Sequence, residues 1–222
     1  MPIFYQQDID EDTKLGIWKI EEDEDFFLQS VVAQRNVSHP HKKLQHLAGR
    51  YLLKYLFPNF PLSLILIADT RKPYLENEAY HFSISHCGDY AAAIVSKTKR
   101  VGIDIEIATG KVERIKHKFL GEEELTIANW QGANKLELDI NGLTLLWSCK
   151  EAVFKWYGLG EVDFKGHIVV KTVNPVNDDS FETIISFEKE TAIYLGLHSR
   201  LFKEQSTIIG QLPTLILSYV TT

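Results

Sequence analysis

The chain has 222 residues, of which 45% are hydrophobic and 24% are charged, and its formal net charge is −6. These are the values of an ordinary globular protein, and they exclude a disordered, collagen-like or disulfide-scaffold chain. A general nucleic-acid binder is also a poor interpretation, because such a protein needs cations that neutralise phosphates.

The charge is distributed unevenly along the sequence. Residues 1–34 carry a net charge of −7, residues 35–118 a net charge of +7, and residues 119–222 a net charge of −6. A basic segment within an acidic protein favours a local anionic ligand. A chance run of solvated Lys and Arg side chains explains the block equally well, so this pattern leaves both interpretations open.

Neither a leader segment nor a membrane span is expected. The N-terminus lacks the basic and apolar regions of a signal peptide, and the longest apolar stretches, such as residues 62–68, are too short to cross a bilayer. We therefore expect a cytoplasmic protein with no membrane partner.

The hydrophobic pattern predicts helices and strands in a mixed order. In the first part of the chain we expect a strand at residues 15–20, an acidic segment leading into a helix that ends near residue 33, and a second helix at residues 44–56 that stops before a proline. Four strands follow, with a turn at residues 86–89 between the second and the third. Their expected ranges are 62–68, 80–85, 91–96 and 101–107.

In the second part, the pattern predicts two helices followed by strands. The first helix is expected at residues 114–130, and the second, which is strongly apolar, at residues 143–157, where two glycines end it. The remaining strands are expected at residues 164–173, 181–187, 192–197, 207–211 and 215–220.

Two pairs of segments echo each other. Residues 15–17 (Leu-Gly-Ile) resemble residues 101–103 (Val-Gly-Ile), and each opens a strand-then-helix series. The helical segments 50–54 and 151–155 also occupy similar positions. The echo suggests two similar halves of about one hundred residues each, although such series also arise by chance.

Cysteine and histidine usage gives no metal signature. Cys87 and Cys149 form no CxxC pair, so we expect neither a disulfide scaffold nor a zinc site. Both are interpreted as small packed residues, with oxidative inhibition through them as the alternative. His39, His41 and His46 lie close together in the sequence, but no metal-binding pattern surrounds them, and we expect them on the surface.

Residues 101–108 form the most informative segment. Alternate residues of a strand share a face, so Asp104 and Glu106 lie side by side with Gly102 and Ala108, opposite an apolar face. Their Cα atoms are about 6.6 Å apart at the rise of a strand, and two such carboxylates can converge on one hard cation such as Mg²⁺. A half-exposed strand with its acids in water is the alternative.

Residues 147–155 place further polar groups on a helix. Trp147, Glu151 and Lys155 are spaced by four and share one face. Glu151 is a candidate third metal ligand or general base, and Lys155 a candidate phosphate ligand; an ordinary surface Glu–Lys pair is the alternative. Because the helix is apolar over most of its circumference, we expect it to be largely buried, and buried charges need partners.

A strand that ends in Ser85 and His86 at a glycine-containing turn forms a third candidate site. A hydroxyl, an imidazole and backbone N–H groups in such a turn can hold a phosphate, and Lys72 lies just upstream. Adjacent strand residues point to opposite faces, so Ser85 and His86 are not expected to act as nucleophile and base. A tight structural hairpin is the alternative.

Four motifs thus occur in order along the chain: Arg-Lys-Pro (71–73), Ser-Ile-Ser-His-Cys-Gly (83–88), Val-Gly-Ile-Asp-Ile-Glu (101–106) and Trp-Ser-Cys-Lys-Glu-Ala-Val-Phe-Lys (147–155). Together they resemble the motifs of the 4'-phosphopantetheinyl transferases of the Sfp type. The resemblance covers residues 35–155. Two positions depart from the family pattern: Arg71 stands where the family usually has glycine, and Cys87 where it often has serine.

The resemblance implies an α+β fold of two similar halves, residues 1–99 and 100–222, related by a pseudo-twofold. In each half a long helix would pack on a small antiparallel sheet, with coenzyme A in the cleft between the halves. The metal carboxylates would lie on the second half only, because Trp18 replaces the corresponding acid in the first. A monomer is expected, since one chain supplies both sides of the cleft.

The implied activity is transfer of the 4'-phosphopantetheine group from coenzyme A to a serine of an apo acyl or peptidyl carrier protein, with release of 3',5'-ADP. Asp104, Glu106 and Glu151 would bind Mg²⁺, with Mn²⁺ as an alternative. Glu151, directly or through a metal-bound water, would be the general base, and Lys155 would stabilise charge on the phosphates.

Several residues would hold the nucleotide phosphates of coenzyme A. The motifs assign this role to Lys72, Ser85, His86 and Lys155. Further basic candidates, which the resemblance does not separate, are Arg35, Lys42, Lys43 and Arg50. Lys150 precedes Glu151, points elsewhere on the helix and is given a smaller role.

Two other functions remain open from the sequence. One is a non-catalytic coenzyme A-binding or carrier-docking module of the same fold, which would need no metal carboxylates. The other is a metal-dependent pyrophosphate hydrolase, which would release phosphopantetheine to water. The expected partners are coenzyme A and a carrier protein from fatty-acid, polyketide or peptide synthesis, with no nucleic acid.

Overall fold

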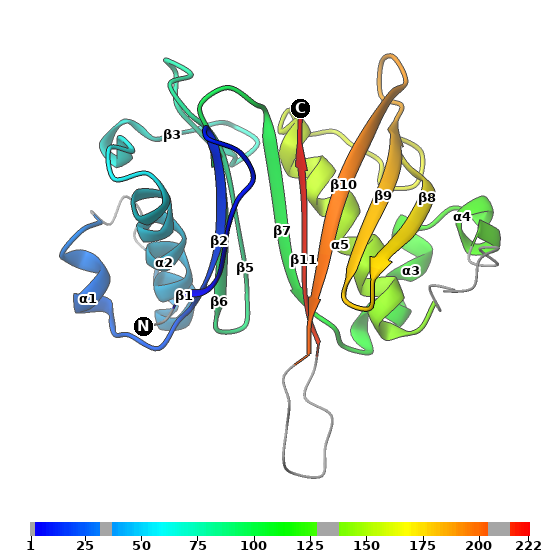
Figure 1. The fold of residues 1–222 in the computed structure, drawn as a ribbon, viewed down its shortest axis with the longest axis horizontal. Coiled ribbons are helices and arrows are strands. Elements are labelled where there is room, and N and C mark those ends of the chain that lie inside the picture. Colours follow the sequence, from blue (N-terminus) through cyan, green and yellow to red (C-terminus); the bar gives the residue numbers. More distant parts are fainter. Residues whose placement is uncertain (1–2, 32–36, 128–137, 204–213) are drawn as a thin grey trace, which may run out of the picture. The chain divides into compact units, whose positions relative to one another are not determined.

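The computed structural model describes residues 3–31, 37–127, 138–203 and 214–222. The chain forms two compact units that divide between Ile105 and Glu106, and each unit packs helices on antiparallel strands (Figure 1). The α+β class expected from the sequence is therefore confirmed.

The first unit is built around a four-stranded antiparallel sheet in the order β1-β2-β6-β5. A separate two-stranded ribbon pairs β3 with β4. The elements of this unit, in chain order, are β1 (Ile3–Asp8), β2 (Thr13–Lys19), α1 (Glu24–Leu28), α2 (Pro40–Leu56), the 3-10 helix η1 (Leu62–Leu64), β3 (Leu66–Ile67), β4 (Pro73–Tyr74), β5 (His81–Cys87) and β6 (Tyr90–Ser96).

Helix α2 organises the core of the first unit, where it packs on β2, β5 and β6 (Figure 1). It begins at Pro40, because proline suits the first helical position and Nδ1 of His39 accepts a hydrogen bond from the backbone N–H of Lys42 (3.5 Å). Gly49 allows a close approach to β5, since a Cβ at this position would lie 2.6 Å from Cγ2 of Ile84.

Some sequence expectations for this unit need correction. The acidic segment does lead into a helix, but α1 ends at Leu28, because the N–H groups of Ser30 and Val31 both turn back to the carbonyl of Phe27. Residue 33 lies outside the described residues. The strand expected at residues 62–68 is split into η1 and the short β3. The apolar pattern gives no prediction for β1, whose second half is polar.

The second unit is built around a sheet in the order β7-β11-β10-β9-β8, and its β8–β9, β9–β10 and β10–β11 pairs are antiparallel. Strand β7 (Val101–Ile107) crosses the division between the units. The other elements are α3 (Lys111–Phe119), α4 (Glu122–Ile127), α5 (Ile140–Tyr157), β8 (Ile168–Asn177), β9 (Ser180–Phe187), β10 (Ile193–Phe202) and β11 (Leu215–Thr221).

Helix α5 organises the core of the second unit, where it packs on β8, β10 and β11. Oδ1 of Asp139 caps its N-terminus by accepting a hydrogen bond from the N–H of Gly142 (2.8 Å). Gly158, at φ 72°, ends it in the left-handed conformation that glycine adopts without strain. Most residues of α5 are buried, as its apolar composition predicts.

The helix expected at residues 114–130 is instead two helices, α3 and α4. They separate at Leu120 and Gly121, because the side chain of Glu124 turns back to accept a hydrogen bond from the N–H of Gly121 (2.7 Å) and so caps a new helix. Strand β8 begins at Ile168 rather than Phe164, since a turn precedes it. The expected strand 207–211 and residues 128–130 lie outside the described residues.

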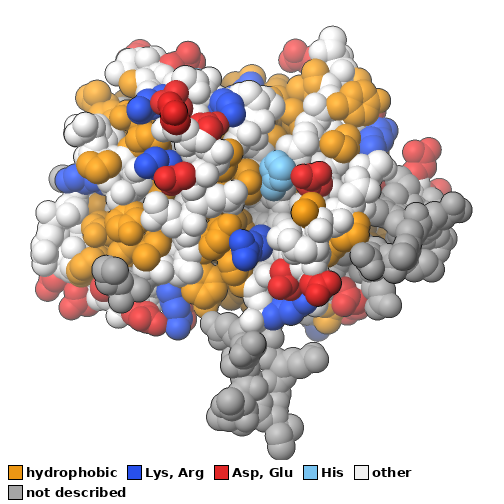
Figure 2. Space-filling model, in the orientation of Figure 1, with side chains coloured by type: hydrophobic (Ala, Val, Ile, Leu, Met, Phe, Trp, Pro, Cys, Tyr) orange, Lys and Arg blue, Asp and Glu red, His pale blue; other side chains and the backbone are white. Residues whose placement is uncertain are grey.

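The surface mixes charges of both signs. Figure 2 shows Lys and Arg side chains intermingled with Asp and Glu on the face that it draws. Exposed ion pairs such as Lys97–Asp12 (3.3 Å) add little stability. In the four ranges that the structure describes, no helix is both long and apolar enough to cross a membrane.

Candidate functional site

Two of the predicted site residues are joined by a direct hydrogen bond in the first unit. Oγ of Ser85 on β5 donates to Oδ1 of Asp104 on β7 at 2.9 Å, and the two side chains are 5% and 2% exposed. Oγ of Ser83, also on β5, accepts a hydrogen bond from the backbone N–H of Ile103 (3.2 Å). The two serines therefore fix β7 and one carboxylate that it carries.

This hydrogen bond changes the interpretation of Ser85. A serine hydroxyl has one proton, and here that proton is donated to Asp104. Ser85 could donate this proton to a phosphate only after breaking its hydrogen bond to the carboxylate. We therefore interpret Ser85 first as a residue that orients Asp104. The neighbouring His86 is exposed whereas Ser85 is buried, as strand alternation predicts.

In the second unit, an indole holds Glu106. Nε1 of Trp147 on α5 donates to Oε1 of Glu106 at 3.2 Å. Trp147 is itself packed between two rings: it stacks on Phe164 (centroids 5.4 Å apart, interplanar angle 22°) and meets Phe119 edge-on (5.1 Å). The orientation of the Glu106 carboxylate therefore depends on how α5 presents Trp147.

Helix α5 carries two further predicted residues, Glu151 and Lys155. They follow Trp147 at intervals of four residues, which places all three on one side of the helix. Both side chains are half-buried rather than fully solvated. The helix therefore presents an acid and a base, in series with the indole, on one face.

The predicted carboxylates fit a hard divalent cation by their chemistry. Asp104, Glu106 and Glu151 offer oxygen donors, which Mg²⁺ and Mn²⁺ prefer. The hydrogen bonds from Ser85 and Trp147 come from neutral groups, so these two contacts orient the carboxylates without adding a positive charge. Within the described part of the chain, however, no three His, Cys, Asp or Glu side chains come together as a metal site. The metal triad therefore stays a prediction.

The three neighbouring histidines each have a structural partner. His39 caps α2, Nε2 of His41 lies 2.9 Å from Oδ1 of Asp89, and Nδ1 of His46 accepts a hydrogen bond from Nη1 of Arg50 (3.0 Å). None of the three is buried. His39 is exposed, whereas His41 and His46 are half-buried, so the expected surface position holds fully for His39 only.

Lys72 lies in the turn that joins β3 to β4. Its carbonyl accepts a hydrogen bond from the N–H of Ala68 (2.9 Å), and the N–H of Arg71 donates to the carbonyl of Ala68 (2.8 Å). Burial, and secondarily the positive charge of Arg100, lowers the pKa of Lys72 to about 8. An anion placed beside this amine would favour its charged form.

Residue 71, where the sequence departs from the family pattern, has an unusual backbone conformation. Arg71 adopts φ 67°, in the left-handed region that side chains disfavour and glycine enters freely. The glycine usual in the family therefore suits this turn, and here arginine adopts the same conformation.

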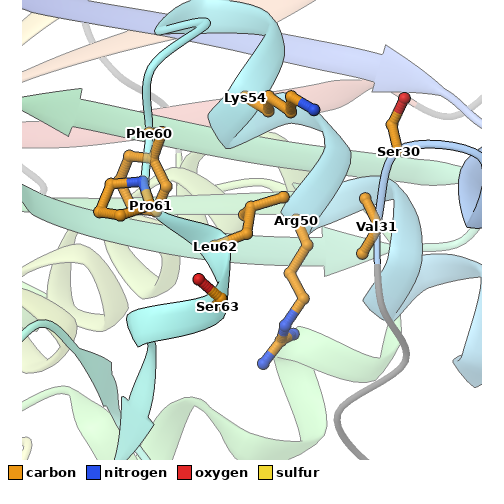
Figure 3. A pocket seen from close by; sticks show the side chains of 8 residues that line it. All are labelled: Ser30, Val31, Arg50, Lys54, Phe60, Pro61, Leu62 and Ser63. Carbon is orange, nitrogen blue, oxygen red and sulfur yellow. The ribbon is translucent and has the colours of Figure 1, made fainter.

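A pocket of about 260 Å³ lies beside α2 in the first unit. Figure 3 shows the Arg50 side chain reaching between Val31 on one side and Leu62 and Ser63 on the other, with Lys54 one turn further along the helix. Arg50 is only 4% exposed. The pocket thus combines a buried guanidinium with an ammonium and hydroxyls, which is a donor set for an anion. It is lined by Ser30, Val31, Arg50, Lys54, Phe60, Pro61, Leu62 and Ser63.

The two cysteines are free thiols. Cys149 is buried, and its Sγ lies 3.3 Å from Oγ of Ser199 and 3.6 Å from Oγ of Ser218. The interpretation as a packed residue is confirmed for Cys149, whereas Cys87 is half-exposed beside the turn of the β5–β6 hairpin.

The structure contains one buried ion pair that was not predicted from the sequence. Lys150, given a smaller role there, is completely buried and bound to Glu124 of α4. A signal for it was present: a lysine inside a helix that is apolar over most of its circumference needs a partner. The partner itself, 26 residues earlier in the chain, carries no sequence signal.

The fold and the site define an α+β protein that carries acidic residues on strand β7 and an acid–base series on a buried helix. The sequence model of the 4'-phosphopantetheinyl transferase superfamily matches residues 100–209. This range includes the whole of β7 and the whole of α5. Over this range the chain is therefore similar to the 4'-phosphopantetheinyl transferase superfamily.

Curated relatives agree with this similarity. The chain is 35% identical over 117 residues to enterobactin synthase component D of Escherichia coli (strain K12), covering 51% of this chain and 54% of that protein. It is 34% identical over 118 residues to enterobactin synthase component D of Shigella flexneri (51% and 54%) and 32% identical over 117 residues to that of Salmonella typhi (51% and 47%). The chain thus spans about half the length of the curated relatives that it matches.

Proposed function

We propose that this protein transfers the 4'-phosphopantetheine group of coenzyme A to a serine hydroxyl of an apo carrier protein. The serine oxygen forms a bond to the phosphorus that bears the pantetheine arm, the pyrophosphate bond breaks, and 3',5'-ADP leaves. The observation that carries the proposal is the family match over residues 100–209, because it contains all the residues to which the chemistry is assigned on β7 and α5.

Asp104, Glu106 and Glu151 are the proposed ligands of a divalent cation, Mg²⁺ with Mn²⁺ as the alternative. When bound, such a cation would neutralise charge on the pyrophosphate. The hydrogen bonds from Ser85 and Trp147 support this assignment, because they orient two of the carboxylates without cancelling their charge.

The remaining roles belong to side chains of this chain. A serine hydroxyl is a weak nucleophile at neutral pH, and Glu151 would accept its proton as the P–O bond forms. Lys155, one turn further along α5, would stabilise the negative charge that develops on the leaving phosphate.

Lys72, His86 and Ser85 are proposed to hold the nucleotide phosphates, with Ser85 acting mainly through Asp104. Among the four further candidates, the structure favours Arg50, because it lines a pocket that offers other anion donors. Lys43 is already paired with Glu24. Lys42 is exposed, and Arg35 lies outside the described residues.

We further propose that the two halves, residues 1–99 and 100–222, are related by a pseudo-twofold, as the resemblance to the Sfp type implies. Each unit contains one long helix, α2 or α5, on its own antiparallel strands, which supports this relationship. A monomer follows from the same interpretation, and a cytoplasmic location is proposed alongside it. The name of the relatives, enterobactin synthase component D, supports a carrier protein of a multi-component synthase as the partner.

The test is transfer itself. The protein is incubated with coenzyme A, Mg²⁺ and a panel of apo acyl and peptidyl carrier proteins, and the carriers are weighed by mass spectrometry. A gain of one phosphopantetheine group with equimolar 3',5'-ADP is expected. Coenzyme A binding without any adduct would favour the non-catalytic module, and phosphopantetheine released to water would favour the hydrolase.

Amino-acid substitutions distinguish a loss of catalysis at the assigned residues from a general loss of structure. Glu151→Gln should lower the transfer rate about a hundredfold or more. Glu113→Gln is the matched control, because Glu113 is an exposed acid on α3 of the same unit, and its rate should not change. Asp104→Ala should abolish transfer in a folded protein, and full activity of this variant would remove the metal assignment.

A further inference from the structure

Lys150 is buried in the second unit, and its ammonium group makes hydrogen bonds to three residues. Its side chain is 0% exposed, and its Nζ donates to Oε2 of Glu124 (2.9 Å) and to the backbone carbonyls of Phe119 (2.5 Å) and Phe164 (2.9 Å). An ammonium group has three protons, and each is used here. Burial lowers the pKa of Lys150, while the adjacent Glu124 acts against this by favouring the charged form.

Both carboxylate oxygens of Glu124 lie near Nζ of Lys150 (Oε1 2.7 Å, Oε2 2.9 Å), and each also accepts a hydrogen bond from a backbone N–H. Its Oε2 accepts a hydrogen bond from the N–H of Gly121 (2.7 Å), and its Oε1 accepts one from the N–H of Val170 (2.9 Å). The ion pair therefore joins α5 to the start of α4, to the turn before β8 and to β8 itself. Breaking one partner would leave the other charge buried and uncompensated.

The two carbonyls held by Lys150 belong to the residues that flank Trp147. Phe119 and Phe164 present their backbone oxygens to Lys150 and their rings to the indole, which lies one turn earlier on α5. The indole N–H in turn donates to Oε1 of Glu106. A continuous series of contacts thus runs from the ion pair, through two aromatic residues and Trp147, to one proposed metal ligand.

We propose that the Lys150–Glu124 ion pair is a positioning element that holds Trp147 in the orientation in which its indole fixes the Glu106 carboxylate. The ion pair does not touch the substrate. It acts through Phe119 and Phe164, and its effect on cation use rests on the proposed function of Glu106. The movement of the indole does not depend on that function and can be measured separately.

The direct experiment follows the indole protons by NMR in ¹⁵N-labelled protein. The Trp147 signal is assigned by its loss in Trp147→Phe, and its exchange with water is measured in Lys150→Met and in the milder, isosteric Glu124→Gln. In both variants the exchange rate of the Trp147 indole proton should rise about tenfold, the equivalent of losing one hydrogen bond. The indole of Trp156 is the internal control, because it lies on the same helix and donates to Oγ1 of Thr222 (2.9 Å).

A rise confined to Trp147 supports the proposal. An equal rise at Trp156 would show that the ion pair only stabilises the unit, and an unchanged Trp147 signal in both variants would show that the indole is held without it. Either of these outcomes overturns the proposal. None of these NMR readouts requires the protein to be a transferase.

A second arm uses the transfer reaction. Lys150→Met and Trp147→Phe should each raise the Mg²⁺ concentration for half-maximal rate about tenfold, and the double variant should do no more than either, because both act through the same contact to Glu106. Trp156→Phe should lower the melting temperature and leave the Mg²⁺ requirement unchanged. Additive effects in the double variant would overturn the positioning role, whereas absence of transfer by the unsubstituted protein would overturn the proposed function and leave the NMR result standing.

Discussion

The hydroxyl of Ser85 donates a 2.9 Å hydrogen bond to the carboxylate of Asp104, and both groups are buried in the first unit. The bond joins two sequence motifs that are 19 residues apart. A hydrogen bond to a buried carboxylate stabilises more than one between neutral groups, and it also fixes the direction of the second carboxylate oxygen.

We expect Ser85→Ala to lower the free energy of unfolding by about 2 kcal/mol and to raise the Mg²⁺ requirement of transfer about tenfold. Ser83→Ala is the matched control, because this serine binds the backbone of Ile103 on the same strand and no carboxylate. It should lower the free energy of unfolding by less, about 1 kcal/mol in chemical denaturation, with an unchanged Mg²⁺ requirement. Equal shifts in the two variants would contradict a specific role for Ser85.

The lowered pKa of Lys72 predicts how coenzyme A binding changes with pH. In the free protein this amine, with a pKa of about 8, loses its proton as the pH rises through that value. A bound phosphate favours the ammonium and raises the pKa, so binding takes up a proton above pH 8. We therefore expect the affinity for coenzyme A, measured by calorimetry, to fall by up to about tenfold per pH unit above pH 8.

Lys72→Arg provides the control, because a guanidinium stays charged across this range. Its affinity should change little between pH 7 and pH 9. If the Arg variant lost affinity in parallel with the unsubstituted protein, another group would carry the pH dependence.

The pocket beside α2 separates the basic candidates for phosphate binding. Arg50→Lys keeps the charge and removes the planar fork, so the affinity for coenzyme A should fall about tenfold. Lys43→Met is the control, since Lys43 is paired with Glu24 and does not line the pocket. A larger loss for Lys43→Met than for Arg50→Lys would assign the phosphate contact to the start of α2 instead.

The left-handed conformation of Arg71 predicts a stabilising substitution. Arg71→Gly relieves the backbone strain, whereas Arg71→Ala removes the side chain and keeps the strain. The glycine variant should therefore be more stable than the alanine variant by about 1 kcal/mol in a denaturant titration. Equal stabilities would show that the turn tolerates a Cβ at this φ.

Strand β7 and helix α5 are the elements that the sequence predicts best. The alternation of Ile with Gly, Asp and Glu is found as one strand with the bounds expected, and the apolar run around Trp147 and Glu151 is a buried helix. Both patterns are local, because the hydrophobic periodicity of a strand or a helix is visible in a short run of consecutive residues. The same holds for the opposite exposure of Ser85 and His86.

Contacts between distant segments could not be predicted in this way. The pairing of Ser85 with Asp104 depends on how β5 lies beside β7, and the partner of Lys150 depends on a break between α3 and α4. That break is made by the side chain of Glu124, which leaves the helical pattern of the surrounding residues almost intact. Periodicity therefore predicts one long helix where tertiary contacts form two.

Capping at both ends of α5 has a geometric consequence. Asp139 and Gly158 fix where the helix begins and ends, so the rise of about 6 Å between Glu151 and Lys155 is set by backbone hydrogen bonds alone. Repacking of the core can tilt or shift the helix as a rigid rod, yet it cannot alter that interval. Variation among related sequences can therefore change the direction in which the acid and the base point, while the distance between them along the helix stays constant.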